Sequence, residues 1–288
     1  MDKKLKIALA QLNPLVGDVS GNIKKLISIR SKLDEDIDIL VAPELYVSGY
    51  PIDDLVLRED FLNLVKEEIN KLVKSTEDNK SAIIVGAPRK DNESIKNSVF
   101  VIENGKVISI KDKYELPNTG VFDEQRIFKQ GPLEDCVEIK GVKFGLPICE
   151  DIWESTVLKK LSSSGAEIII AINASPFTIS KSDERSLVTS SRVDETKLPI
   201  IYLNRTGGQD ELIFDGSSFA LNYDGKKFYS SSEFKEETSV VDFQKINGKW
   251  IGTGKLNNSS SSEERLYKAL VLGLRDYVNN NKFPGVVL

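Results

Sequence analysis

Short apolar runs that alternate with amphipathic stretches restrict the possible folds of this sequence more than any other feature. The runs KIALAQL, IDILVAPE and SAIIVGAPR are separated by NIKKLISIRSKL and EDFLNLVKEEINKLVKS. Runs of four to eight apolar residues are typical of buried strands, and the intervening segments have helical periodicity. The alternation predicts an α/β fold. Asn104 and Gly105 then separate two β-rich stretches, which predicts a type I′ hairpin and therefore some antiparallel pairing.

The same alternation returns in the second half of the chain. The apolar runs there are VKFGLPIC, EIIIAINAS and LPIIYLNR, with helices expected near 154–162 and from about Lys181 to Thr196. Asp224 and Gly225 mark a second hairpin. Two similar halves predict two sheets packed on each other and covered by helices.

The carboxyl-terminal segment has a different composition. The stretch GTGKLNNSSSSEE is polar and Ser-rich, as linkers are. It leads into ERLYKALVLGLRDYVNNNKF, a predicted helix that carries Leu266, Leu270, Leu274 and Val278 on one face. Since an isolated helix with such a stripe needs a partner surface, we expect another domain or a neighbouring subunit to cover it.

Composition excludes several classes of function. A chain of 288 residues that is 40% hydrophobic can form one large globular domain. Its net charge is −5 and its basic residues are scattered, which argues against nucleic acid as a partner. The apolar part of MDKKLKIALAQLNP is too short for a signal peptide or a membrane span. We therefore expect a cytoplasmic protein that acts on small polar substrates without a membrane partner.

The chain has no histidine and only two cysteines, Cys136 and Cys149. Ser-His-Asp triads, Cys-His pairs and zinc hydrolase sites all need an imidazole, so none of them is possible here. The two cysteines form no disulfide framework and no CxxC pair, so we expect no metal site. Any catalytic base must be a carboxylate, a lysine or a tyrosine.

Three residues stand at the expected ends of apolar strands. Cys149 follows FGLPI, and a helix amino terminus near Trp153 would favour its thiolate. Alternatively, it is a small buried hydrophobe. Glu44 follows IDILVAP and could accept a thiol proton or cap a helix. Lys113 ends VISIKDK and could stabilise an oxyanion or be an ordinary solvated lysine.

These three residues also lie in motifs that resemble those of a known family. Glu44 lies in an APEL…GYP setting, Lys113 in a K-x-x-LP…FxE setting and Cys149 in CED. In this order they resemble the Glu-Lys-Cys triad of the nitrilase, or carbon-nitrogen hydrolase, superfamily. The stretches LPICEDIW, INASPF and GGQDELIFDGSSFA are similar to those of its glutaminase domains from glutamine-dependent NAD synthetases, and the resemblance covers residues 6 to about 245. It implies a four-layer αββα sandwich.

The resemblance also implies roles for individual residues. Cys149 would attack the side-chain amide of L-glutamine, Glu44 would act as base and then acid, and Lys113 would stabilise the oxyanion. The result would be a glutamyl thioester and ammonia, formed without a cofactor. Glu150, Ser175 and Lys181 match positions that hold the α-amino and α-carboxyl groups, and Glu124 matches an acid that orients the lysine and the attacking water.

The family architecture implies a division of the chain and further partners. Residues 1–245 would form the hydrolase domain, and residues 246–288 a linker and helix leading toward a synthetase domain that uses ATP and Mg²⁺. Members of the family assemble as homo-oligomers, so we expect the same here.

Two positions depart from the family pattern. Thr119 stands in the wall of the substrate pocket where Tyr is common after LPN, and Arg205 with Thr206 replaces a usual Gln-Val. Two other functions remain open at this point: a free-standing hydrolase of another small amide, and a catalytically silent interaction domain.

Overall fold

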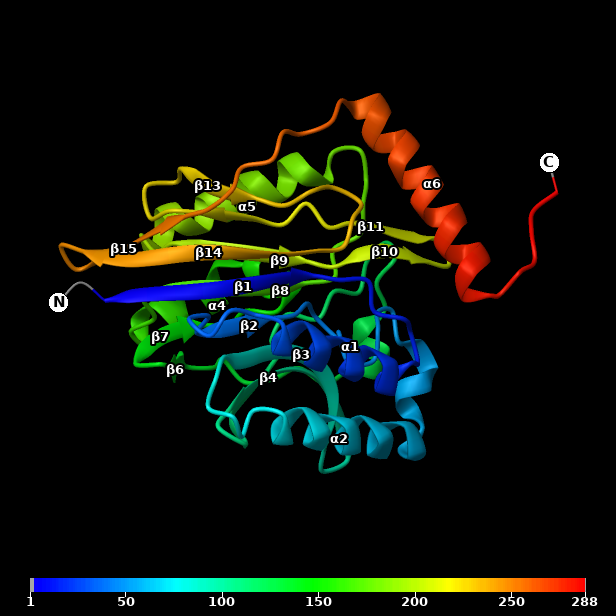
Figure 1. The fold of residues 1–288 in the computed structure, drawn as a ribbon, viewed down its shortest axis with the longest axis horizontal. Helices are drawn as coiled ribbons and strands as arrows, with labels where there is room; N and C mark the ends of the chain where they lie inside the picture. The colour runs from blue at the N-terminus through cyan, green and yellow to red at the C-terminus, as the bar shows by residue number, and fades with distance from the viewer. Residues whose placement is uncertain (1–2, 288) are drawn as a thin grey trace.

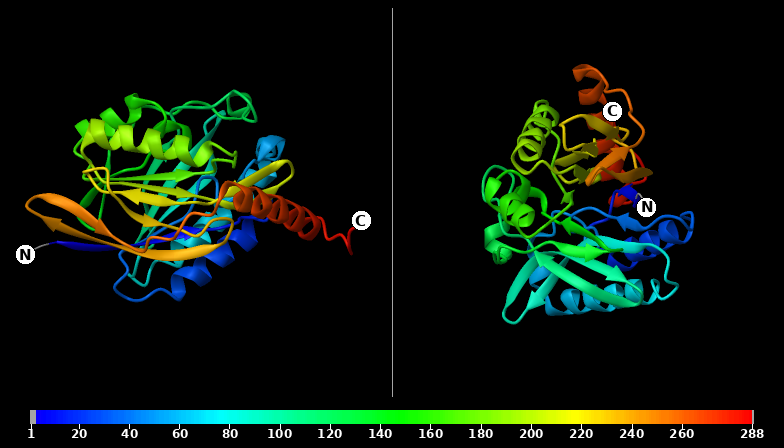
Figure 2. Two further views of the ribbon diagram at one scale, coloured as in Figure 1. Left: turned by 90° about the horizontal axis from the view of Figure 1, so that it is seen from above. Right: turned by 90° about the vertical axis from the view of Figure 1, so that its left-hand side faces the viewer.

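Two large β-sheets lie face to face at the centre of the molecule, with helices on their outer sides (Figure 1 and Figure 2). The structure, a computed structural model, describes residues 3–287. A seven-stranded sheet has the order β15-β14-β1-β2-β3-β4-β5, and a six-stranded sheet has the order β13-β12-β9-β8-β7-β6. A separate two-stranded ribbon, β10-β11, extends beyond them.

The seven-stranded sheet combines parallel and antiparallel pairs. Strands β1, β2 and β3 run parallel, whereas β14, β15, β4 and β5 join as antiparallel neighbours. The strands are β1 (Lys4–Gln11), β2 (Ile39–Val41), β3 (Ala82–Asp91), β4 (Ser94–Glu103), β5 (Lys106–Asp112), β14 (Glu237–Ile246) and β15 (Lys249–Thr253).

The six-stranded sheet has a parallel centre formed by β7, β8 and β9. Its strands are β6 (Val137–Ile139), β7 (Val142–Gly145), β8 (Ile168–Asn173), β9 (Ile200–Asn204), β12 (Phe219–Leu221) and β13 (Lys227–Ser230). The ribbon consists of β10 (Thr206–Gln209) and β11 (Leu212–Asp215).

The helices complete the outer layers. They are α1 (Val19–Ser31), α2 (Glu59–Lys74), α3 (Glu124–Ile127), α4 (Ser155–Ser163), α5 (Lys181–Thr196) and α6 (Ser262–Asn280), with 3₁₀ turns η1 (Asp53–Leu57) and η2 (Cys149–Ile152). Buried residues of α1 and α2 share a core with one face of the seven-stranded sheet, and those of α4 share a core with one face of the six-stranded sheet.

Strand β8 shows why the apolar runs are continuous. Ile168, Ile170 and Ile172 belong to the core between the two sheets, while Ile169 and Ala171 belong to the core beneath the helices. Successive side chains of a strand point to opposite faces, so a strand covered on both sides must be apolar throughout. The four-layer αββα sandwich expected from the sequence is therefore confirmed.

The local predictions hold at the hairpins and helices. Asn104 and Gly105 join β4 to β5 with φ of 50° and 71°, as a type I′ turn requires. Gly225 lies between the antiparallel strands β12 and β13. Helix α5 has the expected bounds, and α4 begins at Ser155.

The sheet continues past residue 245, where the sequence suggested that the linker starts. Lys245 in β14 pairs with Trp250 in β15, so the hairpin between them belongs to the seven-stranded sheet. Regular structure then stops until Ser262, and this linker is attached to the domain: the Asn257 backbone N–H donates to Ser230 Oγ at 2.9 Å. The sequence pattern missed β15 because the strand is short and Gly-containing.

Helix α6 packs on the β10-β11 ribbon at the edge of the molecule (Figure 1). Its buried residues are Ala269, Leu272 and Asp276, and not the expected apolar stripe. Leu270 and Leu274 of that stripe are 62% and 58% exposed. The helix therefore contacts its own domain through one face and leaves a second, apolar face open.

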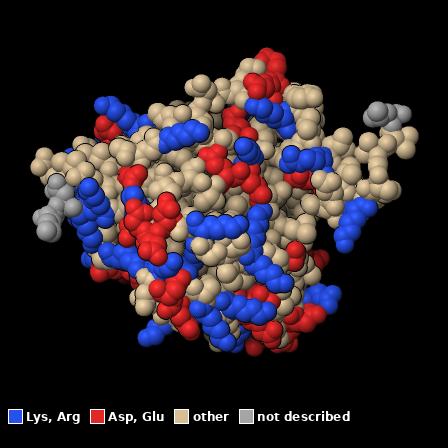
Figure 3. All heavy atoms as spheres, viewed as in Figure 1, with Lys and Arg blue, Asp and Glu red and all other residues tan. Residues whose placement is uncertain are grey.

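Lys and Arg lie among Asp and Glu on the face of the molecule drawn in Figure 3, without a continuous basic surface there. Among residues 3–287, we find no helix whose length and hydropathy would let it cross a bilayer.

Candidate active site

Cys149 lies at a sharp bend after β7, as its place in the sequence suggested. Its φ is +47°, in the left-handed region that non-glycine residues rarely adopt. The Asp151 carboxylate fixes the bend by accepting hydrogen bonds from the backbone N–H groups of Ile148 (2.9 Å) and Glu115 (2.7 Å). The bend is thereby tied to the segment that follows Lys113.

Lys113 lies at the centre of a buried group of charges. It follows β5, and its side chain has no solvent exposure. Its Nζ donates to Glu44 Oε1 at 2.7 Å and to the Glu124 carboxylate at 2.9 Å. The sequence alternative of a solvated lysine is excluded, and the two acids predicted to accompany Lys113 both contact it.

Glu44 is held on both of its carboxylate oxygens. Asn97 Nδ2 donates to Oε1 at 2.8 Å, and the backbone N–H of Ala174 donates to Oε2 at 2.9 Å. Gly86 of β3 lies directly against this turn, since a Cβ there would stand 2.7 Å from Glu44 Cα. Strands from both sheets therefore fix the position of this carboxylate.

Glu124, the first residue of α3, has a second partner besides Lys113. The Tyr50 hydroxyl donates to its Oε1 at 3.1 Å. Burial raises the pKa of Glu124 to about 7; Lys113 opposes that shift and Glu44 adds to it. The ammonium of Lys113 keeps its charge: burial lowers its pKa, but Glu124 and Glu44 outweigh burial and the net shift is upward.

The Cys149 thiol differs from the sequence expectation in its ionisation. Burial raises its pKa well above the usual value, and the negative charge of Glu44 raises it further, against the opposing effect of Lys113. The expected helix is α4, which begins at Ser155, and Cys149 itself opens only the short 3₁₀ turn η2. A thiol with a raised pKa needs a base to become a nucleophile.

A cavity of about 420 Å³ opens onto Cys149. Its lining includes all four residues that the sequence assigned to substrate binding. They are Thr119, Glu150, Ser175 and Lys181. The cavity is therefore large enough for an amino-acid-sized ligand, with Cys149 in its wall. Lys113, Glu44 and Glu124 are outside the cavity lining but close enough for their charges to act on the thiol.

Charged groups surround this cavity. Lys181 Nζ lies 4.1 Å from the centre of the Trp153 ring and 3.2 Å from Glu184 Oε2. Burial raises the pKa of Glu150, against the opposing charges of Lys113 and Lys181. A ligand that carries both an amino and a carboxyl group could pair with both signs of charge here.

Ser175 is fixed from behind. Arg185 Nε donates to its Oγ at 3.1 Å, and Asn204 Nδ2 donates to its carbonyl oxygen at 3.0 Å. Since the hydroxyl oxygen already accepts a hydrogen bond, its own proton can be donated to a ligand.

Sequence reasoning assigned no role to Tyr50, Asn97, Asp151 or Arg185, all of which support the site. Tyr50 and Asp151 lie within quoted motifs, GYP and CED, so their positions were visible but their partners were not. Asn97 gave a weaker signal, a polar side chain before the apolar end of β4. Arg185 lies in α5, whose sequence is mainly polar, so nothing in that sequence distinguishes a buried arginine from an exposed one.

Comparison with known proteins identifies a family to which the chain is similar. Residues 6–248 match the family described as "Carbon-nitrogen hydrolase". The chain is 37% identical over 290 residues to the glutamine-dependent NAD(+) synthetase of Rhodobacter capsulatus, covering 100% of this chain and 52% of the relative. The corresponding protein of Acinetobacter baylyi is 35% identical, with 99% and 52% covered. The chain thus spans about half the length of the curated relatives it matches.

Solved structures give a similar result. The glutamine-dependent NAD+ synthetase of Acinetobacter baumannii, in complex with ADP, superposes with a TM-score of 0.91 at 34% identity and covers 99% of this chain and 54% of that one. An amidase from Nesterenkonia sp. superposes with a TM-score of 0.72 at 18% identity, covering 85% of this chain and 91% of its own, and shows the shared fold. The resemblance seen in the motifs is confirmed, and the chain belongs to the carbon-nitrogen hydrolase family.

Proposed function

We propose that this chain hydrolyses the side-chain amide of L-glutamine and is the ammonia-supplying part of a glutamine-dependent NAD synthetase. One observation carries the proposal: a cysteine lies in the wall of an amino-acid-sized cavity, within the electrostatic influence of a buried lysine that contacts two carboxylates. The names of relatives that are 35–37% identical over the whole chain support the choice of glutamine.

In the proposed first step, Glu44 takes the proton of the Cys149 thiol as sulfur attacks the amide carbon. The carbonyl π electrons move to oxygen, where the Lys113 ammonium stabilises the negative charge. An ammonium has three N–H bonds, and Glu44 and Glu124 accept two of them, which leaves one for the oxyanion. The tetrahedral intermediate collapses, its C–N bond breaks, and the leaving nitrogen takes the proton from Glu44 to depart as ammonia.

The second step uses the same groups in reverse. Water attacks the glutamyl thioester while Glu44 accepts its proton, and the C–S bond then breaks to give glutamate. The thiolate regains its proton from Glu44, so the enzyme returns to its initial state. Glu124 orients Lys113 and the attacking water. This cycle uses no metal ion or cofactor.

Recognition of glutamine would use charges around the cavity. In this proposal Lys181 pairs with the α-carboxylate, Glu150 pairs with the α-ammonium, and the Ser175 hydroxyl donates to the ligand. Thr119 stands in the wall of the pocket.

The proposal extends to the rest of the assembly. A synthetase domain that uses ATP and Mg²⁺ would consume the ammonia to amidate deamido-NAD. The exposed apolar side chains of α6, among them Leu270 and Leu274, support a contact with that domain or with a neighbouring subunit of a homo-oligomer. Two free cysteines support a cytoplasmic location.

Replacement of the nucleophile should abolish turnover. We expect Cys149→Ser to release no measurable ammonia from glutamine, because an alcohol is far harder to deprotonate than a thiol. Cys136→Ala is the matched control: that thiol is half-buried and 3.2 Å from the Ser164 carbonyl oxygen, outside the cavity lining. A coupled ammonia assay measures both. Equal activity in the two variants would refute the assignment, and loss of activity only in Cys136→Ala would reverse it.

Glu44→Gln should lower turnover and lower the Cys149 pKa at the same time. Turnover should fall on the order of 10²-fold or more, as is typical for loss of a positioned base. The pKa should fall because a negative charge that disfavours the thiolate is removed. The pH dependence of Cys149 labelling by methyl methanethiosulfonate measures it. A slow variant whose thiol pKa is unchanged or higher would contradict Glu44 as the base facing the thiol.

Substrate preference distinguishes glutaminase from an amidase of simple amides. Glutamine should be hydrolysed much faster than propionamide, because a charged pocket rejects analogues that leave its groups unpaired. Lys181→Met should raise KM for glutamine and leave propionamide unaffected, whereas Lys159→Met, on an exposed position of α4, should change neither. Propionamide turnover equal to that of glutamine would favour the free-standing amidase. If neither compound is turned over, the result would favour the catalytically silent domain.

A further inference from the structure

Helix α6 touches the domain through charged residues as well as apolar ones. Arg265 lies near its beginning and Asp276 near its end, and both face the domain, with 13% and 7% of their side chains exposed. Between them the helix approaches the ribbon closely: a Cβ on Gly208 would stand 3.1 Å from Gly273 Cα. None of these residues lines the active-site cavity.

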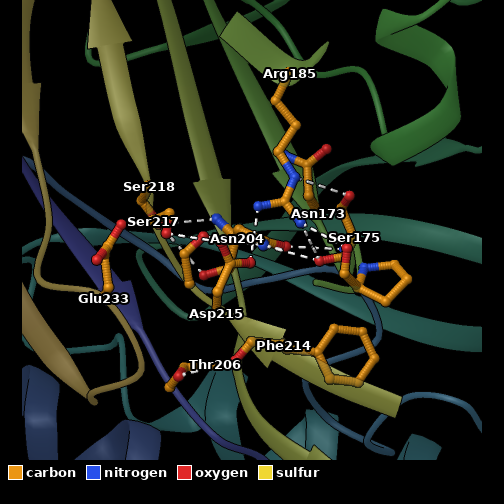
Figure 4. A network of polar contacts seen from close by, with 12 residues as sticks. Asn173, Ser175, Arg185, Asn204, Thr206, Phe214, Asp215, Ser217, Ser218 and Glu233 are labelled. Atoms are coloured by element: carbon orange, nitrogen blue, oxygen red, sulfur yellow. Dashed lines mark hydrogen bonds and ion pairs between the residues drawn. The ribbon is translucent and has the colours of Figure 1, made fainter. Parts of the chain in front are cut away.

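Arg265 begins a series of polar contacts that ends at Ser175 in the cavity wall, and Figure 4 shows its inner part, from Glu233 and Asp215 through Arg185 to Ser175. Its guanidinium pairs with Asp215 at 3.4 Å and with Glu233 at 3.0 Å. Asp215 Oδ1 accepts from Arg185 Nη1 at 2.8 Å, and both of these side chains are 1% exposed. Arg185 then donates to the hydroxyl and carbonyl oxygens of Ser175 at 3.1 and 2.7 Å.

Asp276 begins a second series that ends at the catalytic charges. Its Oδ2 accepts from Asn13 Nδ2 at 2.9 Å, and Asn13 Oδ1 accepts from Arg205 Nη2 at 3.1 Å. Arg205 donates through Nη1 to the carbonyl oxygen of Tyr50. The hydroxyl of Tyr50 donates to Glu124, which contacts Lys113.

Arg205 depends on Asp276 for charge compensation. Its side chain is fully buried, lies 4.3 Å over the Phe214 ring and forms no ion pair within residues 3–287. Burial lowers the pKa of Arg205 to about 9, and Asp276 provides the largest opposing effect. Removal of the Asp276 charge would leave a buried guanidinium with less compensation, which favours its displacement from Tyr50.

We propose that Arg265 and Asp276 are positioning residues through which α6 holds the active site: Arg265 acts on substrate binding by way of Arg185 and Ser175, and Asp276 acts on the chemical step by way of Arg205, Tyr50 and Glu124. The inference rests on the proposed hydrolysis of glutamine at Cys149. Its physical basis is that the inner members of each series are buried and hydrogen-bonded to one another, so a shift at the helix is transmitted; they are Asp215, Arg185 and Ser175 in the first, and Arg205, Tyr50 and Glu124 in the second. Asp276 is itself held by Arg275 at 3.1 Å and by the Gly208 backbone N–H at 2.9 Å. Small displacements of reacting groups carry large costs in rate.

The test is steady-state kinetics of glutamine hydrolysis by the full chain and four variants. Arg265→Gln should raise KM with a smaller change in kcat, and Asp276→Ala should lower kcat with a smaller change in KM, each by roughly 2- to 30-fold. Asp276→Asn retains one acceptor oxygen and should recover part of the loss. Glu263→Gln, which removes an exposed charge from the first turn of the same helix, is the matched control and should behave as wild type.

The double variant Arg265→Gln/Asp276→Ala tests whether the two routes are independent. The two positions are about 16 Å apart along the helix, so independent routes predict that the two effects multiply. Thermal unfolding of each variant identifies any that are not folded, and for those the conservative variants Arg265→Lys and Asp276→Asn take their place.

Several outcomes would overturn the inference. Wild-type kcat and KM in both single variants would do so. The same fall in kcat and the same rise in KM in both variants would also do so, since that pattern indicates general loosening of the helix. If wild type itself hydrolyses no glutamine, the proposed function fails instead. The labelling rate of Cys149 by iodoacetamide then tests the Asp276 route: a rate in Asp276→Ala equal to that of wild type overturns it.

Discussion

The buried ammonium of Lys113 is the interaction on which the rest of this site depends. Removing a charge from water costs several kcal/mol, and removing one partner from a buried pair typically costs about 3–5 kcal/mol. Lys113 avoids that cost only because Glu44 and Glu124 both contact it. Three segments must therefore meet at one point: the loop after β2, the loop after β5 and the start of α3. The two sheets and their connections bring these segments together.

This arrangement also explains how a chain without histidine could activate a thiol. Burial and, after it, the negative charge of Glu44 raise the pKa of the Cys149 thiol, so a base has to remove its proton. Glu44 is fixed by Asn97 and by the Ala174 backbone, and thus retains its orientation while the proton moves. The pKa of the Lys113 ammonium is raised, against the effect of burial, by Glu124 and Glu44. In the proposed cycle, base, nucleophile and cation are three separate groups.

The sequence predicted the layers well, for physical reasons. Strands covered on both faces leave continuous apolar runs, and the candidate catalytic residues Glu44 and Cys149 come directly after such runs. The association of Glu124 with Lys113 was implied by the family resemblance and not by the pattern of residues, because spacing along the chain does not fix which carboxylates meet in space. Tyr50 and Arg205 act through contacts between segments about 155 residues apart, which no local pattern reveals.

The carboxyl-terminal helix shows where pattern reasoning fails. Its most apolar face, with Leu270 and Leu274, is exposed, and the face that packs on the domain mixes Ala269 and Leu272 with Arg265 and Asp276. A hydrophobic stripe predicts a contact but not which partner makes it. Small residues allow the close approach of helix and ribbon, and the charged residues find buried partners, so the contacting face carries no strong apolar signal.

The covalent intermediate provides the most direct test of the central claim that Cys149 takes the acyl group of glutamine. The chain can be mixed with glutamine, quenched in acid and digested, and the peptides examined by mass spectrometry. The account predicts a glutamyl adduct on the peptide that contains Cys149, and its loss when hydroxylamine is added before the quench. Ammonia release with no adduct on that peptide, and no γ-glutamyl hydroxamate formed, would contradict it.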